Sequence, residues 1–182
     1  MQDLSKFNNS WYKPGSVLKR SLWYITNILF FKSGLFPVSS VKCNMLRFFN
    51  ATVGTGVIIK PNVNIKYPWF LVIRNNVWIG EGVWIDNLAQ VTIHNNVCIS
   101  QGAFLLTGNH NYSKISFDLF VKPIILEDGV WIGARSIVCP GVIAHNSSIL
   151  QAGSVAVADL EEQGIYAGNP AVKIKLRQIK TF

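Results

Sequence analysis

The residue of this chain best suited to chemistry is a histidine in an irregular segment. His110 stands in residues 104–123, FLLTGNHNYSKISFDLFVKP, which interrupt a six-residue spacing of apolar residues found on both sides. An imidazole can accept and release a proton near neutral pH, and it often acts as a general base on a hydroxyl group. Loops that a rigid scaffold carries are frequent sites of function. We therefore take His110 as the candidate for chemistry in this chain.

The two other histidines belong to the regular part of the sequence. His94 in IHNNVC and His145 in AHNSSI are both second residues of six-residue units, and we expect them to be ordinary turn residues. A zinc site would need three such side chains converging on one ion, but the three histidines have no paired spacing. No metal site is predicted, and a zinc-dependent hydratase stays open only as a lesser alternative.

The regular part of the sequence can be written as six-residue units. Thirteen of the fifteen first positions hold Val, Ile or Leu, and two hold Ala. Neither the helical period of 3.6 nor the strand period of 2 produces this spacing. A period of six indicates a parallel β-helix, in which three units form one triangular coil and the first-position side chains stack inside. The units begin at residues 53, 59, 65, 73, 79, 85, 93, 99, 105, 126, 132, 138, 144, 150 and 156.

Three steps between units are longer than six residues. The steps 65→73, 85→93 and 105→126 each follow the third unit of a coil, so all three insertions are expected at the same corner of the prism. The longest, residues 106–125, is predicted to be a protruding loop. The fold prediction is an all-β, left-handed parallel β-helix over residues 51–165, with an N-terminal helical segment (1–50) and a basic C-terminal tail (166–182). The left hand follows from the resemblance described below.

The sixth positions of the units face outward, yet many of them are apolar. Apolar outer faces are rarely left in contact with water. We expect residues 16–50 to cover one face and identical chains to cover the other, which predicts a homotrimer. The residues on one face are Ile58, Trp78, Cys98, Trp131 and Ile149, and those on the next are Trp84, Phe104, Ile137 and Val155.

Basic residues cluster at both ends of the 182-residue chain, whose net charge is +8. Residues 1–47 hold seven basic side chains against Asp3 alone, and the tail KIKLRQIK (173–180) adds four more. Such clusters attract anions such as nucleic acid, lipid headgroups or a phosphorylated cofactor. No nucleic-acid-binding module is recognisable, so nucleic acid is not an expected partner.

Other features bear on where the protein acts. The apolar run LWYITNILFF (22–31) is shorter than the ~20 residues that cross a bilayer. It is expected to form a helix packed against protein, with peripheral membrane contact as the alternative. Cys43, Cys98 and Cys139 form no CxxC pair, which suits a reducing compartment. We therefore expect a cytoplasmic protein. In the alternative, it also contacts the inner face of the membrane.

The repeats, the segment LLTGNHNYSKISFDLFVKPIILEDGVWIGA (105–134) and the ending YAGNPAVKIK (166–175) together resemble hexapeptide-repeat acetyltransferases. The most similar branch is the colanic-acid-biosynthesis type, and galactoside, maltose and Nod-factor acetyltransferases are more distant. The resemblance covers about residues 40–180. It implies a left-handed β-helix, a homotrimer with active sites between neighbouring subunits, and acetyl-CoA as the acyl donor.

The resemblance also assigns roles to residues. The family's catalytic histidine falls on His110, and its small residues along the pantetheine channel fall on Ala134 and Ala152. Basic residues after the family's Gly-x-Pro turn contact CoA phosphates, and here they are Lys173 and Lys175. Val172 stands where distant relatives carry Arg, so these phosphate contacts are expected to differ somewhat.

The acceptor is the least determined part of the prediction. Asp86 and Asn87 lie at the loop's corner one coil earlier, and they are candidates for acceptor binding, although turn formation explains them equally well. The predicted activity is acetyl-CoA-dependent O-acetylation of a saccharide used in surface polysaccharide synthesis, by direct transfer with His110 as base. Alternatives are an acetyltransferase for an antibiotic, serine or an amino sugar, and a non-catalytic assembly subunit.

Overall fold

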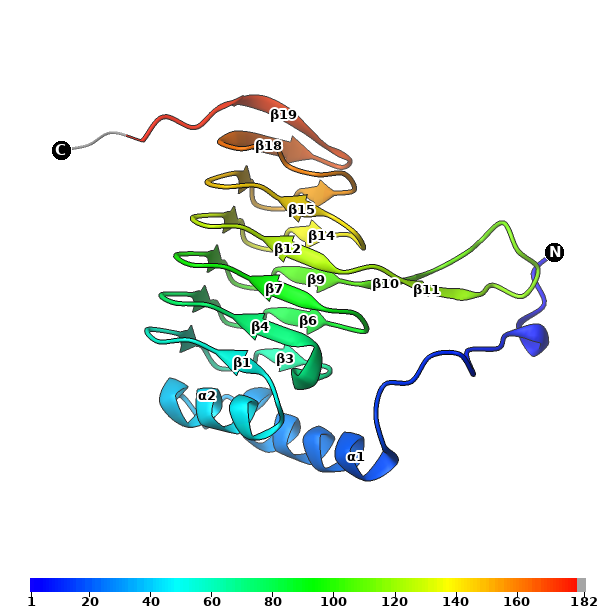
Figure 1. Cartoon of the computed structure of the whole chain (residues 1–182). Helices are drawn as coiled ribbons and strands as arrows, with labels where there is room; N and C mark the ends of the chain where they lie inside the picture. Colours follow the sequence, from blue (N-terminus) through cyan, green and yellow to red (C-terminus); the bar gives the residue numbers. More distant parts are fainter. Residues whose placement is uncertain (180–182) are drawn as a thin grey trace.

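The structure is a computed structural model and describes residues 1–179; the last three residues of the predicted tail lie outside the described residues. Short parallel strands stack into a three-sided prism with helices at one end and a protruding hairpin on its side (Figure 1). Each strand is two or three residues long over most of the prism, so no strand is stable without its neighbours. The all-β fold of stacked parallel coils is the one the sequence predicts.

Three sheets form the sides of the prism, and we name them A, B and C. Sheet A contains β1 (Thr52–Val53), β4 (Leu71–Ile73), β7 (Val91–Ile93), β12 (Ile124–Leu126) and β15 (Ile143–Ala144). Sheet B contains β2 (Ile58–Ile59), β5 (Trp78–Ile79), β8 (Cys98–Ile99), β13 (Trp131–Ile132), β16 (Ile149–Leu150), β18 (Gly164–Gly168) and β19 (Ala171–Leu176). Sheet C contains β3 (Asn64–Ile65), β6 (Trp84–Asp86), β9 (Phe104–Leu106), β14 (Ile137–Val138) and β17 (Val155–Ala156).

The remaining elements lie outside the stacked coils. The helices are α1 (Val17–Thr26), a π-helical turn η2 (Asn27–Phe31) that continues it, and α2 (Ser39–Phe48). Two 3-10 turns are η1 (Leu4–Lys6) and η3 (Pro68–Phe70), and the protruding hairpin is β10 (Gly108–His110) with β11 (Leu119–Val121). β19 runs antiparallel to β18, so these two strands extend sheet B into the segment that the sequence analysis places in the tail.

The core is the column of first-position side chains that the six-residue period predicts. All fifteen are buried, and most have no accessible surface. Fifth-position residues such as Val83, Ala103 and Ser136 are also buried beside them. Burying one Ile or Leu side chain contributes about 1.5–3 kcal/mol, so the inner column is the main source of stability.

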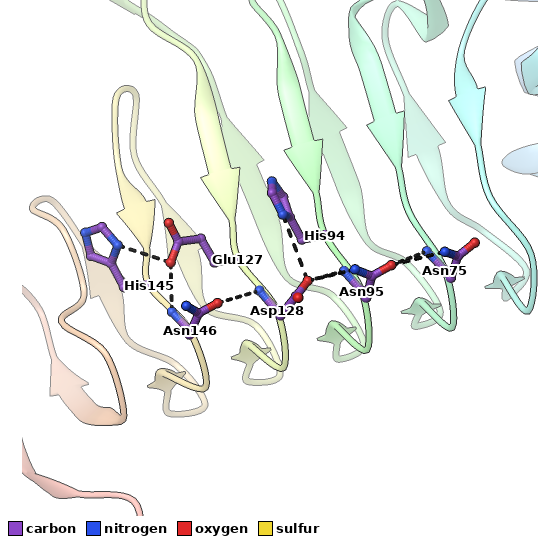
Figure 2. Close-up of polar contacts among 7 residues, drawn as sticks. All are labelled: Asn75, His94, Asn95, Glu127, Asp128, His145 and Asn146. Atoms are coloured by element: carbon purple, nitrogen blue, oxygen red, sulfur yellow. Dashed lines mark hydrogen bonds and ion pairs between the residues drawn. The ribbon is translucent and has the colours of Figure 1, made fainter.

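A ladder of polar side chains runs along the corner between sheets A and B (Figure 2). Asn95 Oδ1 accepts a hydrogen bond from the Asn75 backbone N–H at 3.1 Å, and Asp128 Oδ1 accepts one from the Asn95 N–H at 2.7 Å. Asn146 Oδ1 accepts in turn from the Asp128 N–H at 3.2 Å. The ladder satisfies backbone groups that the turns remove from the sheets, and it explains the Asn and Asp residues at this turn position.

The N-terminal helices cover the open end of the prism, so the expectation that residues 16–50 cover an outer face is wrong. Trp23 Nε1–H donates to Ile65 O at 2.8 Å, and Lys42 Nζ donates to Lys60 O at 2.9 Å. Arg47 Nε donates to Val53 O at 3.0 Å. The first coil has no coil beneath it, and its exposed carbonyl groups and aliphatic side chains therefore need these helices more than the outer faces do.

Both apolar outer faces consequently stay bare in the single chain. Trp78 and Trp131 on sheet B are 44% and 46% exposed, and Trp84 on sheet C is 42% exposed. Trp84 stacks on Phe104 with ring centroids 4.6 Å apart, which continues the apolar column from one coil to the next. Large side chains aligned in this way usually mark an interface.

Replacing Asp128 by Ala should lower the free energy of unfolding by about 1 kcal/mol, because the backbone N–H of Asn95 loses its acceptor. Asp128→Asn keeps an acceptor oxygen and should retain most of the stability. Urea unfolding followed by tryptophan fluorescence measures both. Equal losses in the two variants would mean that the acceptor role assigned to Asp128 is incorrect.

Candidate functional site

The predicted loop forms a β-hairpin whose root is fixed at the corner between sheets C and A. Thr107 is buried there, and its hydroxyl donates to Asp86 O at 2.9 Å and accepts from the Ala89 N–H at 3.0 Å. Gly108 follows, and a Cβ at this position would collide with the side chain of Leu88. β10 and β11 then pair antiparallel, with His110 opposite Leu119. The hairpin therefore leaves the prism in a defined direction (Figure 1).

Two aromatic rings, one from the hairpin and one from the N-terminal segment, pack against the His110 ring. The ring is parallel to the ring of Phe117, with an interplanar angle of 1° and centroids 4.3 Å apart. Phe7 of the N-terminal segment packs on it at 5.6 Å. Phe117 has a φ of +50°, an unusual conformation for an aromatic residue, and non-glycine residues of this kind concentrate at functional sites.

The hydrogen bond of the ring determines which nitrogen accepts a proton. Nδ1 of His110 lies 2.9 Å from the carbonyl oxygen of Phe117. Because a carbonyl oxygen only accepts hydrogen bonds, Nδ1 must carry the hydrogen. In the neutral imidazole, Nε2 then has the lone pair. His110 is thus held in the tautomer whose Nε2 can accept a proton, with a partner that stabilises the ring once Nε2 is protonated.

The N-terminal segment braces the hairpin, a contact that the sequence analysis missed. The Asp3 backbone N–H donates to Ile115 O at 3.0 Å near the tip of the hairpin. Tyr12 donates its hydroxyl hydrogen to Leu88 O at 2.7 Å near the root. Figure 1 shows the N-terminus beside the far end of the hairpin. The two pairs are 112 and 76 positions apart in the sequence, and no local pattern in the sequence signals such contacts.

The two acceptor candidates lie at the root of the hairpin, where Asp86 O accepts the hydroxyl hydrogen of Thr107. Thr107 precedes His110 by three residues, which is about 10 Å along an extended strand. Asp86 pairs with Lys66, with Oδ1 and Nζ 2.9 Å apart, and is 8% exposed. Asn87 has no exposed surface, and its amide nitrogen donates to the carbonyls of Tyr67 and Phe70 at 2.6 and 3.2 Å. Asn87 therefore holds the corner together and has no atom that an acceptor can reach.

The predicted cofactor residues gather at a different corner, between sheets B and C. Ala134 and Ala152 occupy equivalent turns of successive coils, and the Gly153 N–H donates to Ala134 O at 2.8 Å. The turn after β18 lies directly beyond them, since the Gly168 N–H donates to Ser154 Oγ at 3.1 Å. Ala134 is half-buried and Ala152 is exposed. Their small side chains leave the backbone of this corner open to a thin ligand.

The two lysines predicted to bind CoA phosphates lie on β19, the edge strand of sheet B, which runs antiparallel to β18. Both Lys173 and Lys175 are exposed. Lys173 forms an ion pair with Glu161, and this hydrogen bond raises the pKa of Lys173. A phosphate would therefore compete with Glu161 for Lys173.

One chain does not bring the two groups of residues together. Ala134 and Ala152 lie where sheet B turns into sheet C, whereas the hairpin leaves where sheet C turns into sheet A. A side of six near-extended residues is up to about 20 Å long, and the hairpin continues away from the B–C corner (Figure 1). His110 and the cofactor candidates of the same chain thus lie at opposite edges of sheet C.

The other two histidines lie in turns of the A–B corner, each beside an acidic residue (Figure 2). His94 Nδ1 is 3.9 Å from Asp128 Oδ1, and His145 Nδ1 is 3.2 Å from Glu127 Oε2. Within residues 1–179, no three His, Cys, Asp or Glu side chains gather in a way that could hold a metal ion.

Comparisons with known proteins agree with this architecture. No family model matches the chain. A colanic acid biosynthesis acetyltransferase, WcaF, of Escherichia coli is 32% identical over 178 residues, covering 97% of this chain and 98% of the relative. The solved structure of a galactoside acetyltransferase in complex with coenzyme A has a TM-score of 0.78 at 25% identity, covering 88% of this chain and 82% of that one. A hexapeptide-repeat acetyltransferase from Vibrio cholerae, complexed with acetyl coenzyme A, has a TM-score of 0.81 at 20% identity, covering 92% and 93%.

The fold is therefore that of a left-handed parallel β-helix, as the sequence predicts. The chain belongs to the hexapeptide-repeat acetyltransferases, and the predicted resemblance and enzyme class are confirmed.

The tautomer of His110 can be tested directly. Long-range ¹H–¹⁵N correlation spectra of histidine-labelled protein should show a protonated Nδ1 and an unprotonated Nε2 for the neutral ring, because Phe117 O accepts from Nδ1. His110→Ala identifies the signals. A neutral ring protonated on Nε2 would contradict the structural assignment.

Proposed function

We propose that this protein is an acetyl-CoA-dependent O-acetyltransferase that acetylates a hydroxyl of a saccharide, with His110 as the general base. The observation that supports it most is the fixed tautomer of His110, whose Nε2 is the proton-accepting atom. The names of the relatives support the class of acceptor, since they include a colanic acid biosynthesis acetyltransferase and a galactoside O-acetyltransferase. A precursor of a surface polysaccharide in the cytoplasm is the acceptor we favour.

The reaction needs one base and two bound substrates. Nε2 of His110 takes the proton of the acceptor hydroxyl as its oxygen attacks the carbonyl carbon of the acetyl thioester. The tetrahedral intermediate collapses, the carbon–sulfur bond breaks, and the proton passes from Nε2 to the sulfur of CoA. The products are the acetyl ester and CoA. The Phe117 carbonyl stabilises the imidazolium that forms between these steps.

We propose further that the active site is completed between chains of a homotrimer. A cofactor bound along Ala134 and Ala152 cannot meet His110 of its own chain, because these residues lie on different corners. The bare tryptophans of sheets B and C supply apolar surface on two sides, which suits a closed ring of three prisms. Lys173 and Lys175 would then hold CoA phosphates at the same groove.

A pocket beside the hairpin suits a saccharide acceptor. It has a volume of about 580 Å³ and lies between the N-terminal segment and the hairpin. Trp11, which is 54% exposed, offers an aromatic face to a sugar ring, and amide, hydroxyl and charged groups surround it. Its lining includes Asn8, Ser10, Trp11, Asn111, Lys114 and Asp118. An acceptor in this pocket would be next to the residue that follows His110.

Replacing His110 by Ala should lower the turnover number at least 100-fold, because positioned base catalysis contributes about 10²–10⁴-fold. Thiol release from acetyl-CoA with a glycan panel, and mass spectrometry of the product, measure this. His94→Ala is the matched control and should keep normal turnover, since His94 lies in a turn of the A–B corner. Normal turnover in a folded His110→Ala variant would reject His110 as the base.

A complementation experiment tests the shared site. Ala152→Trp should block the cofactor groove, and His110→Ala removes the base, so each variant alone should be inactive. Trimers reassembled from an equal mixture should recover about a quarter of the wild-type activity, since one in four sites combines an intact His110 with an intact Ala152 of the neighbour. Mixtures that stay inactive, although native mass spectrometry shows mixed trimers, would place both residues in a site within one chain.

A further inference from the structure

The outer side of α1 carries an apolar stripe with no partner in the chain. Leu18, Leu22, Ile25 and Leu29 are 70%, 50%, 55% and 57% exposed. Their spacing of four, three and four residues aligns them along one side of the α1 and η2 helix. Trp23 on the opposite side is 2% exposed, and it anchors the helix to the first coil. The stripe therefore faces away from the stacked coils. α1 itself lies at one end of the prism (Figure 1).

Positive charge surrounds this stripe. Lys13, four residues before α1, and Lys32, directly after η2, are both exposed. A pocket of about 550 Å³ opens between α1 and strand β3, and its lining combines cations with apolar side chains, namely Arg20, Lys32, Lys66, Tyr24 and Ile25. Residues 1–47 contain seven basic side chains and one acidic one. An apolar strip flanked by cations matches an anionic lipid surface, with acyl chains under the strip and phosphates beside it.

We propose that α1 docks this protein on an anionic phospholipid membrane, lying in the plane of the interface. Within residues 1–179, no helix is long and apolar enough to cross a bilayer, so the contact is peripheral. A second copy of the chain is a poorer partner for the stripe. Pairing the N-terminal helices of two chains through it would bring two strongly basic segments together. An anionic membrane offers phosphates to the basic residues and acyl chains to the apolar stripe.

The proposed orientation adds to the proposed function and rests on it. With α1 on the membrane, the prism axis stands upright, and the hairpin leaves after the third coil. Two coil spacings of about 4.8 Å and a helix layer of about 10 Å place His110 roughly 20 Å above the surface. An acceptor saccharide attached to a membrane lipid would be presented at this height. In a trimer, the three α1 helices would lie at the same end and contact the membrane at the same time, which strengthens attachment.

Vesicle sedimentation with the full-length protein tests the docking. Wild-type protein should sediment with vesicles of phosphatidylcholine and phosphatidylglycerol, and much less with phosphatidylcholine alone. Leu22→Gln with Leu29→Gln should lower binding more than tenfold, because the stripe loses its apolar centre. Lys13→Gln with Lys32→Gln should lower it about fivefold per lysine removed, and less so at high salt.

The control pair is Val157→Gln with Ile174→Gln, which changes two similarly exposed apolar residues (57% and 50%) away from α1. It should bind vesicles like the wild type. Equal binding by the stripe variant, or no vesicle binding by the wild type, would overturn the proposal. A fall in the molar mass of the stripe variant without lipid would also overturn it, because the stripe would then join copies of the chain. Thiol release with a soluble acceptor should be normal in the stripe variant, so failure of docking is distinguishable from failure of the proposed function.

Discussion

The structure depends on the register between successive coils. Backbone hydrogen bonds join each short strand to the strand one coil away, and the aliphatic first-position residues stack in the same register. Neither interaction tolerates a slip, because a shift of one residue would turn the buried column outward. Positions one coil apart in the sequence are therefore neighbours in space. This regularity makes the corners of the prism stiff, and each functional candidate is placed by the corner from which it comes.

The hairpin shows how a flexible segment becomes ordered on such a scaffold. Its root is held by Thr107 and by the close approach of Gly108 to Leu88, and its far end is held by the N-terminal segment. His110 lies between these two attachments, with Phe7 and Phe117 against its ring. The side chain is thus supported by its own hairpin and by the N-terminal segment, which is about 100 residues away in the sequence. This order suits the proposed role of His110 as a base, since a loose ring would lose the geometry that proton transfer requires.

The ends of the prism are covered by other segments of the chain, whereas two of its sides are not. At the first coil, α1 and α2 satisfy carbonyl groups that have no partner strand, and the opposite surface of α1 stays apolar. At the last coils, β18 and β19 extend sheet B and bring the turn at Gly168 to the corner of Ala134 and Ala152. The sides keep their tryptophans exposed. In a single chain the ends of the prism are therefore covered and the sides are bare, which suits the proposed homotrimer.

The sequence by itself determined the repeating core, the corner from which the insertions leave and the distinction between His110 and the two turn histidines, because all of these follow from a period of six. It also led to the family, through the histidine loop and the Gly168-Asn169-Pro170 ending. Tertiary structure decided what depends on contacts between distant segments. The helices cover the end of the prism because the unpaired first coil needs hydrogen-bond partners, which no periodicity reveals. Asn87 is buried as a corner brace, and the tautomer of His110 follows from a carbonyl seven residues away. Such facts depend on where the folded backbone turns its polar groups, and the spacing of residue types does not contain that information.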